Sequence, residues 1–427
     1  MSHIETKCVQ EGYKPENGQP RVLPIYQSTT YKYDSSSHVG DLFDLKVPGH
    51  MYTRISNPTT ACVEEKIAAL EGGVDAICTS SGQAASFMSV FNITGAGQNF
   101  VCSSAIYGGT VNLFNVTMKR MGIEVRFIVD GMSPGEIDAL FDENTRLVFG
   151  ETIANPALKV LDIEAYADLA HRHGVPLIVD NTFATPVLCR PFEYGADIVI
   201  HSTTKYMNGH ASVVGGAVID SGNFQWTDKY PELTTPDESY HGLVYTEQFG
   251  KKAYIEKARV QIMRDLGMTP APISMFMLNE GLESLALRVD RHSQNALAVA
   301  EYLAGDKRVS WVNYPLLKGD TEYEKAKKYL KRGASGVVSF GVKGGRAAAM
   351  KFMDSLRLAN IVVHVADART CVLHPASTTH RQLTDEQLAA GGISPDLVRM
   401  SIGIENVEDI IADIDQALRR AEEAQCL

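Results

Sequence analysis

The sequence has no long apolar run. In its 427 residues, nothing approaches the roughly 18 consecutive apolar residues that a membrane-spanning helix needs. Residues 1–20 are polar and lack the apolar stretch of a secretory signal peptide. We therefore expect a cytoplasmic protein without a membrane-spanning segment.

The sequence has no cluster of cysteines, and it has fewer basic than acidic residues. The seven cysteines are scattered without C-x-x-C spacing, which is typical of reduced thiols in the cytoplasm. No cluster of His, Cys and Asp has the spacing of a metal site, so we expect no metal. Acidic residues outnumber basic ones by 51 to 40, and the net charge of −11 argues against nucleic acid or an anionic membrane as the main partner.

The chain is longer than the roughly 250–300 residues at which a single core usually stops growing, so at least two lobes are expected. Residues 1–60 show no sustained period and predict an arm that is disordered or lies across a neighbouring surface. From residue 61 onward, short apolar runs alternate with helix-like stretches. The runs expected to be strands are 74–80, 99–104, 124–129, 146–151, 176–181 and 196–202, and the expected helices are 82–92, 110–121 and 162–173. Such runs indicate strands buried on both faces of a mostly parallel sheet, which predicts an α/β layered domain over residues 61–265.

A second, smaller α/β unit is expected over residues 266–427. An apolar strand at 336–343 precedes a helical stretch at 346–358, and a strand at 397–404 leads into a closing helix. Apolar residues recur at helical spacing in that last helix and form one face: Val407, Ile410, Ile411, Ile414 and Leu418.

Ligands of open parallel sheets bind beyond the carboxyl ends of the strands, and Gly82 follows one such end. A glycine at a helix start lets an anion approach the free N–H groups of the first turn. The sequence there is neither a P-loop nor G-x-G-x-x-G. Taken alone, this segment favours an ordinary strand-to-helix turn over an anion site.

Lys205 follows a very apolar strand and two hydroxyl residues, Ser202 and Thr204. A lysine in this position is a solvated surface residue, a phosphate ligand or an amine that forms an imine with an aldehyde cofactor. The apolar strand favours desolvation, which lowers the pKa of the amine. A neutral amine is what Schiff-base chemistry requires.

Asp180 ends the apolar run 176–181. A carboxylate at a strand end is a helix cap, a metal ligand or, beside a pyridine-type cofactor, an ion-pair partner for the ring nitrogen. In the last case the protonated ring becomes an electron sink.

Taken together, several motifs resemble those of the Cys/Met-metabolism family of pyridoxal-phosphate enzymes, in the same order and over nearly the whole chain. The segments that carry the resemblance are Tyr52 to Thr59, Ser80 to Ala85, Tyr107 to Thr110, Asp180 to Pro186, His201 to Tyr206, His374 to His380 and Arg399 to Glu405. The resemblance implies the transferase fold of pyridoxal-phosphate enzymes (fold type I, similar to aspartate aminotransferase). That fold has a mostly parallel central sheet between helices and a smaller C-terminal α/β domain.

The resemblance also implies a role for each matching residue. Lys205 would carry pyridoxal 5'-phosphate as a Schiff base, Asp180 would pair with the ring nitrogen, and Tyr107 would stack on the ring. The phosphate would be held by the backbone amides of Gly82 and Gln83 and the hydroxyls of Ser202 and Thr204, and Ser81 and Thr182 would also belong to the cofactor site. Tyr52 and Arg54 would reach the phosphate of a neighbouring subunit, because a planar guanidinium suits a dianion. Asn155 would touch the 3-oxygen of the ring, and Arg399 would bind the substrate carboxylate, with Asn155 and Tyr107 beside it.

Within the family, the chain is most similar to O-acetylhomoserine sulfhydrylases, on segments 222–245, 264–296 and 365–388. This implies γ-replacement of acetate by sulfide to give homocysteine for methionine biosynthesis, in a homotetramer of dimers with shared active sites. The alternatives are a cystathionine γ-synthase, a γ-lyase acting on methionine or cystathionine, an enzyme for another homoserine ester, or a cofactor-binding protein without turnover. Gly109 stands where methionine γ-lyase has a reactive cysteine, and Ala366 stands where glycine is expected.

Overall fold

Two β-sheets organise the protein in the computed structural model, which describes residues 2–378, 381 and 394–424. The larger sheet has the order β1-β7-β6-β5-β4-β2-β3, and every strand except β7 runs in the same direction. Its strands are β1 (Asp75–Thr79), β2 (Asn99–Ser103), β3 (Glu124–Ile128), β4 (Thr145–Glu151), β5 (Leu177–Asp180), β6 (Ile198–His201) and β7 (Gly216–Asp220). The expected mostly parallel sheet is therefore confirmed.

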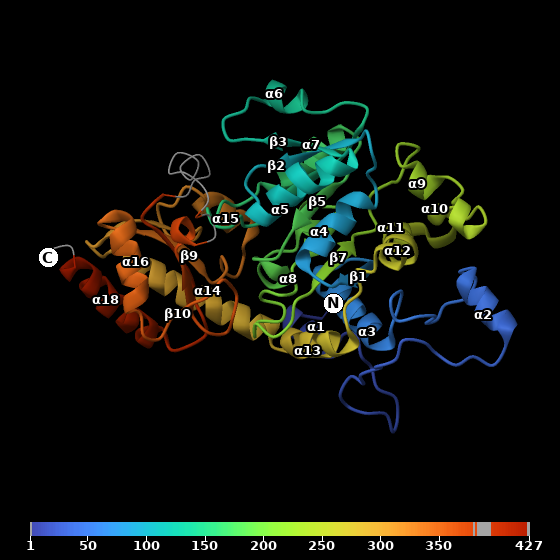
Figure 1. Ribbon diagram of the computed structural model, residues 1–427, viewed down its shortest axis with the longest axis horizontal. Coiled ribbons are helices and arrows are strands. Elements are labelled where there is room, and N and C mark those ends of the chain that lie inside the picture. The colour runs from blue at the N-terminus through green and yellow to red at the C-terminus, as the bar shows by residue number, and fades with distance from the viewer. Residues whose placement is uncertain (1, 379–380, 382–393, 425–427) are drawn as a thin grey trace.

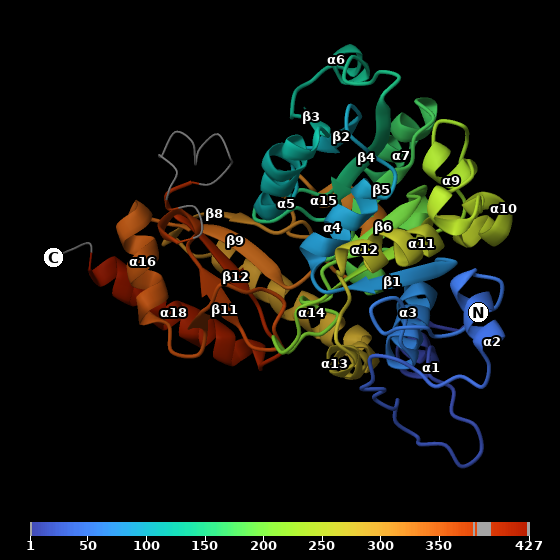
Figure 2. The same ribbon diagram turned by 45° about the vertical axis from the view of Figure 1, so that its right-hand side comes forward.

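The smaller sheet is mainly antiparallel and has the order β10-β11-β12-β9-β8. Its strands are β8 (Val309–Asn313), β9 (Val337–Val342), β10 (Asn360–Ile361), β11 (Cys371–Leu373) and β12 (Leu397–Ser401). Figures 1 and 2 show it beside the larger sheet, with the long helix α14 (Leu285–Ala304) running between the two. This helix contacts β8 and β9 on one side and α8 (Thr185–Leu188) on the other.

Helices cover both sheets. Those of the first two thirds of the chain are α1 (Ile4–Gln10), α2 (Ser36–Phe43), α3 (Pro58–Glu71), α4 (Gly82–Phe91), α5 (Gly108–Asn112), α6 (Pro134–Asp138), α7 (Ile163–Arg172), α9 (Pro231–Thr234), α10 (Tyr245–Phe249), α11 (Ala253–Lys257), α12 (Arg264–Leu266) and α13 (Pro272–Glu283). The later ones are α15 (Tyr323–Tyr329), α16 (Gly345–Ser355) and α18 (Val407–Glu423). Among the described residues, no helix is long and apolar enough to cross a bilayer.

The side chains of the larger sheet alternate between its two faces, and each face packs into its own hydrophobic core. Successive side chains point to opposite faces of a strand, so Val148 joins one core and Phe149 the other. On the second face, Phe114 packs edge-on against Phe149 and Phe100, with ring centroids 5.0 Å apart in each pair. Both faces being buried explains why the strands read as continuous apolar runs.

The N-terminal segment is better ordered than its sequence indicated. Helix α1 packs against α3, α13 and α14, and these helices lie together in both views (Figures 1 and 2). Asn57 accepts a hydrogen bond from Thr59 N and caps the start of α3. The same side chain donates to the carbonyl of Tyr26, at 2.9 Å, and so ties the preceding chain to the domain.

The remaining expectations met different outcomes. The helix expected at 110–121 forms as α5 followed by one π-helical and one 3₁₀ turn, ending at Met121. The closing helix is confirmed as α18, with Ile410, Ile414 and Leu418 buried. Thr379 and His380, at the end of one quoted motif, lie outside the described residues.

Candidate active site

The carboxyl ends of β4, β5 and β6 meet at one edge of the larger sheet. Glu151 and Asp180, the last residues of β4 and β5, are register partners. Thr182 follows β5, and its hydroxyl accepts a hydrogen bond at 2.8 Å from Ser202 N, just past β6. The sheet topology therefore brings together the polar residues that the sequence places after its strands.

Lys205 lies in the turn after β6 and is partly buried. The turn is closed by its own backbone, because Lys205 N donates to Ser202 O at 3.2 Å and Gly209 N donates to Lys205 O at 2.8 Å. Loss of hydration lowers the pKa of the amine to about 8, and the positive charge of Arg399 adds to this shift. A substantial fraction of the amine is therefore neutral near physiological pH.

Asp180 is held by the residue that also binds Ser202. Thr182 donates to Asp180 Oδ1 twice, from its backbone N at 3.0 Å and from its hydroxyl. Desolvation raises the pKa of Asp180, although these hydrogen bonds oppose the shift. A cation beside this carboxylate would restore its charged form.

Glu151 is a buried carboxyl at the end of β4, and the sequence alone did not place it in the site. Its Oε2 accepts a hydrogen bond from Tyr107 N at 2.6 Å. Burial, with a further contribution from the negative charge of Asp180, raises its pKa well above the ordinary value. Its position next to Asp180 in a parallel sheet was a signal that could have revealed it.

A close approach at Gly82 forms a cradle at the start of α4. A Cβ built on Gly82 would lie 2.6 Å from Ser202 Cβ and 2.8 Å from Ser202 Oγ, so only glycine fits. Ser81 caps the helix by accepting from Ala84 N at 3.1 Å. The first N–H groups of a helix have no acceptor in a preceding turn, so those of Gly82 and Gln83 are suited to an anion.

Two other residues predicted to bind the cofactor have partners within the protein. Thr204 Oγ1 donates to Gly215 O at 3.1 Å and accepts from Gly215 N at 3.0 Å, so its hydroxyl shapes the loop. Gln83 accepts a hydrogen bond at 3.3 Å from Thr110 Oγ1 through its side chain.

Arg399 brings the smaller sheet to the site. It lies on β12, and its Nη1 donates to Asn155 Oδ1 at 3.1 Å, while its Nε is buried without a partner among the described residues. Desolvation lowers its pKa, and Cys371 and Tyr107 are the groups whose charges oppose this shift. Tyr107, the residue before α5, is 49% exposed.

Tyr52 and Arg54 form a separate exposed pair. The Arg54 guanidinium lies 5.4 Å from the centre of the Tyr52 ring, and Tyr52 is 41% exposed. The same guanidinium donates a hydrogen bond to Arg264 O. Their contact with a neighbouring subunit remains a proposal.

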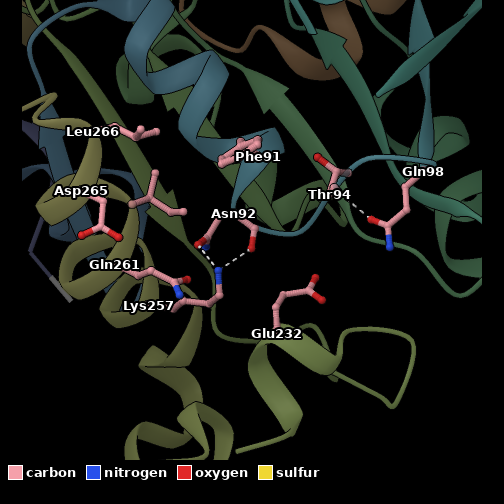
Figure 3. A pocket seen from close by; sticks show the side chains of 11 residues that line it. Phe91, Asn92, Thr94, Gln98, Glu232, Lys257, Gln261, Asp265 and Leu266 are labelled. Atoms are coloured by element: carbon pink, nitrogen blue, oxygen red, sulfur yellow. Dashed lines mark hydrogen bonds between the residues drawn. The ribbon is translucent and has the colours of Figure 1, made fainter. Parts of the chain in front are cut away.

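A different pocket, of about 430 Å³, contains another lysine (Figure 3). It lies at the far end of α4, where Lys257 Nζ donates to the backbone O of Asn92 at 3.0 Å and to its Oδ1 at 3.2 Å. The pKa of Lys257 is also lowered to about 8, mainly by desolvation. Its hydrogen bonds to Asn92 occupy the amine. Because α4 has 10 residues, its two ends are about 15 Å apart, which separates this pocket from Gly82.

The residues around Lys205 fit pyridoxal phosphate. The cradle at Gly82 would take the phosphate, Lys205 the aldehyde carbon and Asp180 the ring nitrogen. Arg399, with an unpartnered Nε, would receive the substrate carboxylate.

His364, whose Nδ1 is 3.5 Å from Lys205 Nζ, was missed by sequence reasoning, and no local pattern marks it.

Comparison with known proteins agrees with this chemistry. The model of the Cys/Met metabolism PLP-dependent enzyme family matches residues 5–419. A homocysteine synthase from Schizosaccharomyces pombe is 46% identical, over 98% of this chain and 99% of that relative. An O-acetyl-L-homoserine sulfhydrylase from Thermus thermophilus is also 46% identical, over 97% of this chain and 99% of that relative.

Solved structures give the same result. A protein assigned as an O-acetylhomoserine (thiol)-lyase from Campylobacter jejuni carries a pyridoxyl-lysine phosphate at its position 205. It has a TM-score of 0.94 and 36% identity, and the match covers 98% of this chain and 100% of that one. The structure of metB from Corynebacterium glutamicum has a TM-score of 0.83 and 34% identity, with 98% of each chain covered. The chain therefore belongs to the Cys/Met metabolism family of pyridoxal-phosphate-dependent enzymes and has their fold.

Proposed function

We propose that the protein converts O-acetyl-L-homoserine and sulfide to L-homocysteine and acetate, as a step of methionine biosynthesis. The observation that carries the proposal is the partly buried Lys205 amine, whose pKa is lowered by desolvation and by the charge of Arg399, in a chain whose relatives include homocysteine synthases and O-acetylhomoserine sulfhydrylases. The cofactor, when bound, supplies an electron sink for the substrate carbons.

The residues of the site then divide the work. Lys205 would hold the cofactor through Nζ, and the same nitrogen, once free, would remove the proton from the α-carbon of the substrate. A pKa of about 8 suits a group that must both accept and return a proton near neutral pH. Arg399 would hold the substrate carboxylate, and Asn155, bonded to it at 3.1 Å, would orient the guanidinium and touch the ring oxygen.

The remaining predicted residues would bind the cofactor. Asp180 would keep the ring nitrogen protonated, with Thr182 fixing the carboxylate, and Tyr107 would stack on the ring. Ser81, Gly82, Gln83, Ser202 and Thr204 would form the phosphate site, which Tyr52 and Arg54 of a neighbouring subunit would complete.

We further propose an arm at residues 1–60, a cofactor domain at 61–265 and a small domain at 266–427, assembled as a homotetramer of dimers in the cytoplasm. The exposed pair Tyr52 and Arg54 supports shared active sites, and closed symmetry favours even assemblies. The net charge of −11 fits small-molecule substrates rather than nucleic acid.

The test supplies the cofactor-loaded protein with sulfide and, in turn, with the O-acetyl, O-succinyl and O-phospho esters of homoserine. We expect homocysteine to form fastest from the O-acetyl ester, and not at all in the Lys205→Ala variant. If homocysteine formed only from the O-succinyl or the O-phospho ester, that ester and not O-acetylhomoserine would be the substrate. Full activity of Lys205→Ala would refute the role of the lysine.

A further inference from the structure

His364 faces the Lys205 amine from the other sheet. It lies in the loop between β10 and β11, and its Nδ1 is 3.5 Å from Lys205 Nζ. Within the described part of the chain, this imidazole is the one hydrogen-bond partner of the amine. The contact therefore joins the two sheets at the atom on which the proposed chemistry depends.

The fold fixes this loop on both sides of the contact. Ala366 N donates to Ser401 Oγ at 2.7 Å, and Ala368 N donates to Gly209 O at 2.9 Å. Gly209 N in turn donates to Lys205 O at 2.8 Å, so the loop of His364 is bonded to the turn of Lys205 itself. Ala366 also adopts a φ of +69°, a conformation that costs a non-glycine residue roughly 1–2 kcal/mol. The loop keeps this shape because its neighbours hold it.

The imidazole of His364 is uncharged near neutral pH. Desolvation, followed by the positive charge of Lys205, lowers the pKa of His364 to about 4, and Arg399 and Arg369 contribute in the same direction while Asp367 opposes them. A neutral imidazole keeps one nitrogen lone pair, and Nδ1 can therefore accept a hydrogen bond from the amine.

Within the described part of the chain, the side chain of His364 makes its one hydrogen bond to Lys205. Nε2 of His364 is buried without a partner among the described residues, and such an atom costs roughly 1–3 kcal/mol. His374, by contrast, uses both nitrogens, at 2.9 Å from Ser377 Oγ and 2.8 Å from Pro395 O. His374 has the hydrogen bonds of a structural histidine, whereas the polar contact of His364 is directed at Lys205.

We propose that His364 is a positioning residue for Lys205, which accepts a hydrogen bond from Nζ and holds the amine toward the cofactor site whenever Lys205 is free. The inference rests on the proposed role of Lys205. Lysine has a flexible four-carbon stem, and a fixed acceptor restricts where its amine lies. The step that this favours joins Nζ to the aldehyde carbon of the cofactor as an imine and releases one water molecule.

The test measures the rate of imine absorbance after pyridoxal phosphate is added to the full-length protein freed of its cofactor, as a function of pH. His364→Asn keeps an acceptor oxygen in the place of Nδ1. His364→Leu and His364→Ala remove the acceptor, and the alanine variant serves if the leucine does not fit. One net hydrogen bond corresponds to about a three- to tenfold slower plateau rate in the variants without an acceptor, with the asparagine variant close to wild type.

Two results would overturn the inference. Wild-type loading rates in the leucine and alanine variants would remove the role of the acceptor. Equal slowing in all three variants would assign the ring to packing. Failure of the wild-type protein itself to form an imine at Lys205 would instead contradict the proposed function, so the two failures are distinguishable.

Discussion

At the residue scale, the pKa of Lys205 sets a pH dependence. Because desolvation lowers this pKa to about 8, the amine is mostly protonated and unreactive below pH 7 and mostly neutral above pH 9. We expect the rate of imine formation to rise about tenfold per pH unit at low pH and to level off above an apparent pKa near 8. A rate that still climbs through pH 10 would show an ordinary solvated lysine.

Asp180 and Glu151 are neighbouring carboxyls, and we expect Asp180 to act as a charged group and Glu151 as a neutral one. Asp180→Asn removes the charge proposed to hold the ring nitrogen, and a loss of at least 2 kcal/mol, or about thirtyfold in turnover, is expected. The matched control is Glu151→Gln. The raised pKa of Glu151 favours its neutral form, which glutamine imitates, so its turnover should change little. Equal losses in the two variants would contradict this assignment.

At the scale of elements, a buried network ties α3 to the strand ends that carry the site. Glu71 Oε1 accepts a hydrogen bond from Asn181 Nδ2 at 2.9 Å and lies 2.6 Å from His201 Nε2. Breaking a buried pair leaves a polar group unsatisfied, so Glu71→Ala should lower the free energy of unfolding by about 3–5 kcal/mol in urea titrations. Glu65→Ala, at an exposed position of the same helix, should change it by less than about 0.5 kcal/mol. Similar losses in both variants would refute the role of the network.

Most strands of the larger sheet could be predicted from the sequence, whereas some buried strands, such as β7, could not. The apolar runs located six of the seven strands of the larger sheet, because a parallel strand covered by helices has no polar face. The missed strand, β7, has five residues and begins at Gly216. The smaller sheet yielded only β9 and β12, since short strands such as Asn360–Ile361 carry no period.

The residues of the site also differ in whether the sequence could predict them. Asp180 and Lys205 could be located because Asp180 ends one apolar strand and Lys205 follows another, whereas His364 reaches Lys205 across 159 residues. A contact of that kind depends on tertiary structure that no local pattern records.

At the scale of the whole molecule, shared active sites predict complementation. A hybrid dimer of a Lys205→Ala subunit and an Arg54→Ala subunit would keep one site with both residues intact. We expect the purified hybrid, made by co-expression with two affinity tags, to be more active than either parent variant. Activity no greater than the mean of the parents would mean that Arg54 serves its own chain, as would a fully active monomer in light scattering.

The reaction itself is tested most directly by identifying products by mass spectrometry. The cofactor-loaded protein is given O-acetylhomoserine with sulfide, with cysteine or with neither. The proposed function predicts homocysteine and acetate, formed only when sulfide is present. Cystathionine formed from cysteine, or oxobutyrate and ammonia released without a thiol, would contradict it and indicate a different γ-reaction at the same lysine.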